Sequence, residues 1–246
     1  MGVWSAKEAD GAATKAINRR TRRGRASPDR AAGPPGASQP KAGWDRGLRA
    51  IFGHKAPRAE KLIVGLGNPG DGYAATRHNV GFQVAARLAK RARLEFATKA
   101  ADARVAEGQL GGVLVAIARP QTFMNDSGRS VRKLLDRYRL APSDLIVVSD
   151  DIDLPLGTLR LRANGGPGTH NGMRSIVSAI GPDFPRLRVG VAPMDPRAEL
   201  PDLADFVLQP FAPDEQDAVL AAVTRAAEAI EVALRDFRRA MDQFNG

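Results

Sequence analysis

Residues 61–81 read KLIVGLGNPGDGYAATRHNVG, and this stretch decides the fold class. The apolar run at its start predicts a buried β-strand, and helical periodicity begins only after a polar loop. Gly65, Gly67 and Gly70 also spell GxGxxG, the pattern of a dinucleotide-binding loop. Such a loop needs its last glycine where a helix begins, but here Pro69 lies inside the pattern and a further polar stretch follows. We therefore predict no nicotinamide cofactor.

The chain beyond this stretch alternates strand and helix patterns. Strands are predicted at 113–118, 144–148, 158–162 and 186–191, and helices at 80–94, 130–140, 170–180 and from about 213. The last helix has an apolar stripe of Val219, Leu220, Val223, Ala227, Ile230 and Leu234. Alternating strands and helices predict an α/β fold, a three-layer αβα single domain around a mixed, largely parallel sheet.

Composition excludes several classes of protein. The 246 residues include no cysteine, so disulfides, thiolate catalysis and cysteine-ligated zinc are excluded. There is no run of about 18 apolar residues and no apolar signal segment, so we expect a cytoplasmic protein without a membrane span.

The positive charge is concentrated in a basic leader. Residues 1–60 hold 13 of the 37 Lys and Arg residues but only 5 of the 27 Asp and Glu. We predict a mostly disordered extension over 1–58, with a short amphipathic helix near 43–52, and a folded domain over 59–246. The leader is expected to attract RNA non-specifically, and a transit peptide is an alternative that its acidic residues count against.

Polar side chains follow three of the predicted strands. Asn68, Asn125 and Asp150 each lie near a carboxyl end, where the ligand crevice of an open α/β sheet forms. His78 and His170 lie in polar Gly/Asn contexts beside helix starts. These residues predict an enzyme with a polar cleft and a histidine base.

Each of these residues also has a simpler interpretation. Asn68 suits a turn and Asn171 a helix cap. Asp150, Asp151 and Asp153 suit turns, or a weak metal site of hard oxygen ligands. The loop GGPGTHNG is either flexible or a backbone nest for an anion. Neither GxSxG nor HExxH occurs, so no motif supports a serine hydrolase or a zinc protease.

Five motifs together resemble the bacterial-type peptidyl-tRNA hydrolase family: IVGLGNPG, YxxTRHNxG, QTFMNxSG, SDDIDLP and GGPGTHNG, in this order over about 61–245. The resemblance implies hydrolysis of the ester that joins a peptide to tRNA, by a monomer without a metal, another cofactor or an obligate protein partner. The alternative is a non-catalytic, splicing-factor-like RNA-binding relative. Ser149 and Thr169 depart from the family pattern, where histidine and glycine are common, and this puts substrate affinity in doubt more than chemistry.

The same resemblance implies roles for single residues. His78 is the base that activates water, and Asp150 orients its imidazole and stabilises the protonated form. Asn68 helps to distinguish peptidyl-tRNA from aminoacyl-tRNA with a free amine. Contacts to the substrate or tRNA are implied for Tyr73, Phe123, Met124, Asn125, His170 and Asn171.

Arginines on two predicted strands suggest a surface for RNA. Arg160 and Arg162 share one strand face, Arg186 and Arg188 share another, and Arg174 lies early in the helix after His170. Outward arginines suit contacts to phosphates, although an ordinary solvated face has the same composition. Arg162, Arg174 and Arg188 are the tRNA-binding candidates.

Overall fold

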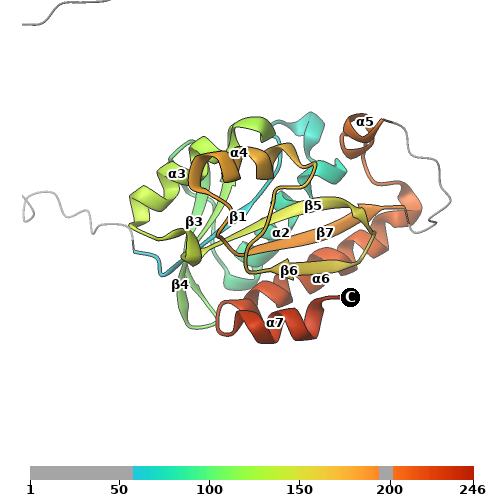
Figure 1. The fold of residues 1–246 in the computed structure, drawn as a ribbon. Coiled ribbons are helices and arrows are strands. Elements are labelled where there is room, and N and C mark those ends of the chain that lie inside the picture. Colours follow the sequence, from blue (N-terminus) through green and yellow to red (C-terminus); the bar gives the residue numbers. More distant parts are fainter. Residues whose placement is uncertain (1–57, 194–201) are drawn as a thin grey trace, which may run out of the picture. The chain divides into compact units, whose positions relative to one another are not determined.

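The computed structural model describes residues 58–193 and 202–246 (Figure 1). Residues 1–57, which make up almost all of the basic leader, lie outside the described residues. The predictions of disorder and of a helix at 43–52 therefore fall outside them as well. No helix in the described ranges is long and apolar enough to cross a membrane.

A single seven-stranded sheet forms the centre of the described chain. Its strands are β1 (Lys61–Gly65), β2 (Thr98–Ala100), β3 (Ala103–Leu110), β4 (Val113–Pro120), β5 (Leu145–Pro155), β6 (Leu159–Arg162) and β7 (Arg186–Ala192). Their order is β2-β3-β4-β1-β5-β7-β6. The four central strands are parallel, while β2, β3 and β6 pair antiparallel with their neighbours. The predicted mixed, largely parallel sheet is confirmed.

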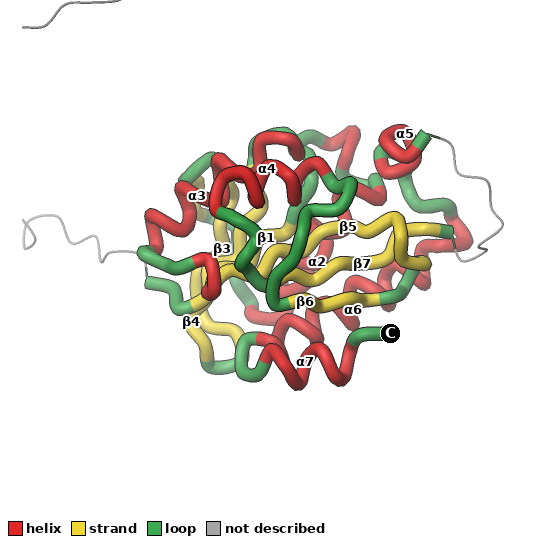
Figure 2. Tube along the Cα trace, viewed as in Figure 1, coloured by secondary structure: helices red, strands yellow, loops and turns green. Residues whose placement is uncertain are grey.

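Helices cover both faces of this sheet (Figure 2). They are α2 (Val80–Ala92), α3 (Ser127–Tyr138), α4 (Asn171–Ile180), α6 (Gln216–Ala233) and α7 (Phe237–Phe244). The short helix α5 (Leu203–Val207) lies instead against the turn Arg77–Asn79. Alternate residues of β1 point to opposite faces: Leu62 and Val64 pack with α3 and α4, and Ile63 packs with α2, α6 and α7. This two-sided burial explains why the central strands read as continuous apolar runs.

The glycines of the opening stretch allow a helix to approach a strand closely. A Cβ on Gly65 would lie 2.1 Å from the carbonyl oxygen of Gly81, and a Cβ on Gly81 would lie 2.5 Å from the nitrogen of Leu66. Any side chain at either position would therefore push α2 away from β1. The GxGxxG spelling reflects this packing in part, since Gly65 is its first glycine.

Three features differ from the sequence-based expectation. The hairpin of β2 and β3 was not predicted, because β2 is short and has no buried position, and two of the four buried positions of β3 are alanine, which favours strands only weakly. The terminal helix is two helices, α6 and α7, and Asp236 caps the second by accepting the Arg239 N–H at 3.0 Å. Leu220, predicted in the apolar stripe, is 58% exposed because it follows Val219 around the helix and faces away from the sheet.

Candidate active site

The carboxyl ends of the central strands carry an open cavity of about 770 Å³. Asn68 follows β1, and His78 lies in the short 3-10 helix Arg77–Asn79 that leads into α2. Asp150 lies inside β5, two residues beyond the position where β1 ends its pairing. His170 is the residue that caps the N-terminus of α4.

Most of the predicted site residues meet in this cavity. It is lined by Asn68, His78, Phe123, Met124, Asn125, Asp150, His170, Asn171, Arg174 and Arg188, among others. The departures Ser149 and Thr169 line it as well. Tyr73 and Arg162 are not among the lining residues; Tyr73 is half-buried and Arg162 is exposed on β6.

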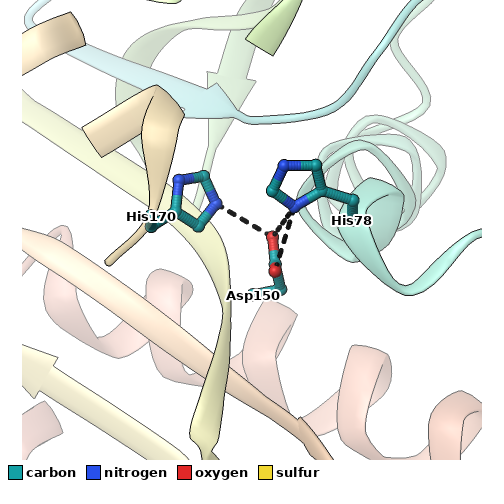
Figure 3. A group of neighbouring side chains, drawn as sticks. All are labelled: His78, Asp150 and His170. Atoms are coloured by element: carbon teal, nitrogen blue, oxygen red, sulfur yellow. Dashed lines mark hydrogen bonds and ion pairs between the residues drawn. The ribbon is translucent and has the colours of Figure 1, made fainter. Parts of the chain in front are cut away.

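One buried carboxylate joins the two imidazoles (Figure 3). Asp150 is 4% exposed, and its Oδ1 and Oδ2 lie 2.9 and 3.0 Å from Nδ1 of His78. Its Oδ1 is also 2.9 Å from Nε2 of His170. The two rings lie 4.9 Å apart between centroids and are tilted by 42°. Each imidazole therefore presents a different nitrogen to the same carboxylate.

The hydrogen bonds assign the protons of the two rings. Nδ1 of His170 accepts the Met173 backbone N–H at 3.2 Å, so the neutral ring carries its proton on Nε2 and donates it to Asp150. Nδ1 of His78 faces the carboxylate and donates to it, which leaves the Nε2 lone pair of His78 without a partner among the described residues. Only His78 therefore keeps a free basic nitrogen at the cavity.

The carboxylate of Asp150 is ionised in this setting. Burial alone raises the pKa of a carboxyl, but attraction to the two imidazoles and their hydrogen bonds outweigh it and lower the pKa of Asp150 well below its usual range. A carboxylate that stays ionised accepts from both rings and stabilises positive charge that develops on either.

Asn68 is held so that its amide group faces the cavity. Its Oδ1 accepts the Met124 backbone N–H at 2.8 Å, which leaves Nδ2 as the free end of the side chain. The side chain of Asn79 bonds to the backbone N–H and C=O of Asn68, at 2.8 and 3.0 Å. Asn79 lies in the quoted motif, but no pattern in the sequence indicated that its amide would hold the loop after β1.

Arg186 is not the outward arginine that the strand pattern indicated. It is 1% exposed, stacks on the Phe184 ring at 4.1 Å, and donates to the carbonyl oxygens of Gly165, Gly166, Pro182 and Phe184. Burial lowers the pKa of Arg186 to about 10, so it remains charged at neutral pH. The glycine-rich loop folds back over this side chain, and that contact removes it from solvent.

Arg188 reaches the same loop from β7. It pairs with Asp151 at 3.2 Å and donates to the carbonyl oxygen of Gly166 at 3.1 Å. Arg174 is exposed and donates to the carbonyl oxygen of Gly168 at 3.3 Å. Both arginines line the cavity, and both also hold the loop that leads to His170.

The three aspartates of SDDIDLP do not form one metal site. Asp150 is bonded to the two imidazoles, and Asp151 is bonded to Arg188 and to the Asp153 backbone N–H. Within the described ranges, the group with ligand atoms close enough for a metal ion is His78, Asp150 and His170, whose atoms lie within 4.8 Å of one another.

The cavity has an apolar wall, of which the family resemblance implied Phe123 but the sequence did not indicate Leu203 or Leu208. Phe123, Leu203 and Leu208 are 62%, 48% and 42% exposed, and all three line the cavity. Two of them lie in or beside α5, a short helix without a usable periodic pattern. Large apolar side chains left open at a polar cavity suit a ligand with an apolar part.

A free imidazole nitrogen supported by a buried carboxylate suits the activation of water, so the fold and the cavity indicate a hydrolytic enzyme built on an αβα sandwich. The family model described as peptidyl-tRNA hydrolase matches residues 62–246. The chain belongs to the peptidyl-tRNA hydrolase family.

Similar proteins agree with this assignment. A peptidyl-tRNA hydrolase of Roseiflexus sp. (strain RS-1) is 52% identical over 177 residues, which is 71% of this chain and 80% of the relative. That of Chloroflexus aurantiacus is 48% identical over 187 residues, 75% of this chain and 98% of the relative. A crystal structure of peptidyl-tRNA hydrolase from Acinetobacter baumannii is 34% identical with a TM-score of 0.70, and covers 78% of this chain and 98% of that one.

Proposed function

We propose that this protein hydrolyses the ester bond between peptide and tRNA in peptidyl-tRNA, with His78 as the base that activates water. The observation that carries the assignment of the base is the difference between the two histidines. Nδ1 of His170 is occupied by a backbone N–H, whereas Nε2 of His78 is free at the cavity. A base needs that free lone pair, and its contribution is typically about 10²–10⁴-fold.

The reaction follows from this arrangement. Nε2 of His78 takes a proton from water while the water oxygen bonds to the ester carbonyl carbon. Asp150 stabilises the imidazolium that forms. The tetrahedral intermediate then breaks its bond to the ribose oxygen, which receives the proton from His78. The products are a peptide with a free carboxyl group and tRNA with a free hydroxyl group.

Side-chain amides supply the polar contacts to the substrate. Nδ2 of Asn68 points away from the bond that fixes its Oδ1, and is a donor for the substrate carbonyl or the peptide backbone. Asn125 and Asn171 are exposed at the cavity and offer further amide contacts. Preorganised donors of this kind are worth about 10²–10³-fold when they reach an oxyanion.

The phosphates of the tRNA backbone are proposed to bind the arginines beside the cavity. Arg174 lies at its edge, and Arg160 and Arg162 are exposed on β6. Because Arg188 is paired with Asp151, we assign it a smaller role in phosphate contact than Arg160, Arg162 and Arg174, which form no ion pair with a described residue. Tyr73, although half-buried and outside the cavity lining, is retained as a contact to a longer substrate.

The deciding experiment is release of tRNA from N-blocked aminoacyl-tRNA by the purified chain. We expect release from the blocked substrate and little from the same tRNA with a free amine. EDTA should leave the rate unchanged. Loss of activity in EDTA that zinc or another divalent ion restores would instead assign His78, Asp150 and His170 to a metal.

A binding protein without catalysis is the outcome that would overturn the proposal. Such a protein would bind tRNA and release none. Light scattering of the same sample tests the expected monomer, and fractionation of the source cells tests the expected cytoplasmic location.

A further inference from the structure

The residue that precedes His78 is a buried cation. Arg77 is 6% exposed and donates to both carboxylate oxygens of Glu215, at 3.0 and 2.6 Å. It also donates to the backbone oxygen of Val191 at 3.3 Å, in β7. One guanidinium thus joins the turn that carries His78 to the end of β7 and to the segment before α6.

Two aromatic rings lie close to the same guanidinium. Its central carbon lies 4.4 Å from the ring centroid of Phe206 and 4.8 Å from that of Phe211. Burial alone would raise the pKa of Glu215, but the hydrogen bonds from Arg77 and the Ala212 N–H, with the charge of Arg77, lower it. The ion pair is therefore charged, and its guanidinium lies close to two aromatic rings.

The backbone of the turn is attached to the same region. Thr76 pairs with Pro210 in an isolated antiparallel bridge, and the Arg77 N–H donates to the Gln209 oxygen at 3.1 Å. These contacts fix the residue immediately before His78 at both its backbone and its side chain. Among the described residues, the ring of His78 has a side-chain hydrogen-bond partner only in Asp150, so its position depends on this backbone.

Phe206 connects this cluster to the apolar wall. Phe206 belongs to α5, is 5% exposed and packs against Arg77. Leu203 lies on the same helix and Leu208 directly follows it, and both line the cavity. We infer that Arg77 is a positioning residue: it holds His78 against Asp150 and seats α5 as the cavity wall through one guanidinium. The inference rests on the proposed function, because it assigns Arg77 to the geometry of the proposed base.

Lysine cannot replace this guanidinium. Its ammonium is a point charge, whereas the contacts use a planar group that binds a carboxylate with two nitrogens and lies within 4.8 Å of two ring centroids. Arg77→Lys therefore keeps the charge and loses the geometry. Arg119→Lys is a matched control, because Arg119 lies over Phe96 at 4.1 Å and Phe82 at 5.8 Å and is not a cavity residue.

The test measures kcat, KM and melting temperature for the full chain, Arg77→Lys, Arg119→Lys and His78→Ala, on N-blocked aminoacyl-tRNA at a temperature where each is folded. Arg77→Lys should lower kcat on the order of 10-fold or more with little change in KM, because the base is displaced. Arg119→Lys should keep kcat even where its melting temperature falls. Histidine-labelled protein should show a shifted or broadened His78 NMR signal in Arg77→Lys, with the His170 signal unchanged.

The outcomes separate the two proposals. If His78→Ala loses turnover while Arg77→Lys keeps both kcat and the His78 signal, the positioning role is wrong and the base stands. If His78→Ala itself keeps turnover, the proposed base is wrong. Should Arg77→Lys not fold, Phe206→Leu replaces it, and an unchanged kcat in that variant would likewise overturn the inference.

Discussion

His78 and His170 share the carboxylate of Asp150, but different parts of the molecule support them. His78 follows a turn tied to β7 and to the segment before α6 through Arg77. His170 ends a glycine-rich loop that lies on the buried guanidinium of Arg186 and caps α4 with its own ring.

The difference separates the proposed base from an imidazole with a structural part. The ring of His170 is bonded at both nitrogens, so it braces the carboxylate and has no lone pair to offer. Among the described residues, the ring of His78 is bonded at one nitrogen only. Two histidines at similar distances from one carboxylate thus have different chemistry because of a single backbone N–H.

Replacing each histidine in turn gives the largest contrast. His78→Ala should lower turnover by about 10²–10⁴-fold, because it removes the proton acceptor, and should leave tRNA binding largely intact. His170→Ala should lose far less turnover, with a loss of about 1 kcal/mol of stability from the missing helix cap. Single-turnover rates and tRNA binding measure both, and equal losses of rate would contradict the comparison.

Removing the shared charge affects both rings. Asp150→Asn keeps one acceptor oxygen and introduces an amide donor, so only one imidazole can be bonded as before. We expect a fall in kcat on the order of 10²-fold, through lost orientation of His78, and a smaller effect than His78→Ala. Steady-state kinetics tests this, and a rate equal to that of the unchanged protein would remove Asp150 from the mechanism.

Replacing Arg186 isolates the support of His170. Arg186→Met fills a similar volume but leaves buried carbonyl oxygens without donors, so the free energy of unfolding should fall by about 3 kcal/mol. KM should rise more than kcat falls, because the displaced loop lines the cavity and does not carry the base. Urea unfolding and kinetics measure the two effects; a fall in kcat alone would contradict the assignment.

Acid should weaken the support of His78 through Glu215. The pKa of Glu215 is lowered in the folded chain. The ionised carboxylate therefore stabilises the fold fully above the unfolded-state pKa of about 4.3, and this stabilisation is lost as the pH falls through the folded-state pKa. The stability difference between the unchanged protein and Glu215→Gln should therefore be constant above about pH 5.5 and shrink below about pH 4.3. Urea unfolding across this range checks it, and a difference independent of pH would exclude the ion pair as its cause.

The smallest effect is expected outside the site. Arg160→Gln with Arg162→Gln should leave kcat unchanged and weaken tRNA binding several-fold at low salt. If both arginines contact phosphates, the slope of log affinity against log salt concentration should fall by up to about 1.4–1.8 in magnitude. An unchanged slope would show that these arginines are only solvated.

Much of the fold could be predicted because its signals are local. The apolar runs of the central strands, the 3.6-residue periodicity of α2, α3 and α4, and the alternation of β6 and β7 all follow from side-chain spacing. The hairpin of β2 and β3 was missed because its small residues carry little pattern. α5 was missed because a single helical turn is too short to show one.

The sequence by itself determined the layered sheet and the family resemblance through its motifs, and its polar residues at strand ends indicated where a site would form. Only the tertiary structure decided the roles within that site. Arg186 is buried although it alternates like a surface residue, because a loop 20 residues away folds over it. His170 is occupied and His78 is free because of how each ring meets the backbone beside it. Such distinctions depend on contacts between distant segments, which spacing along the chain does not encode.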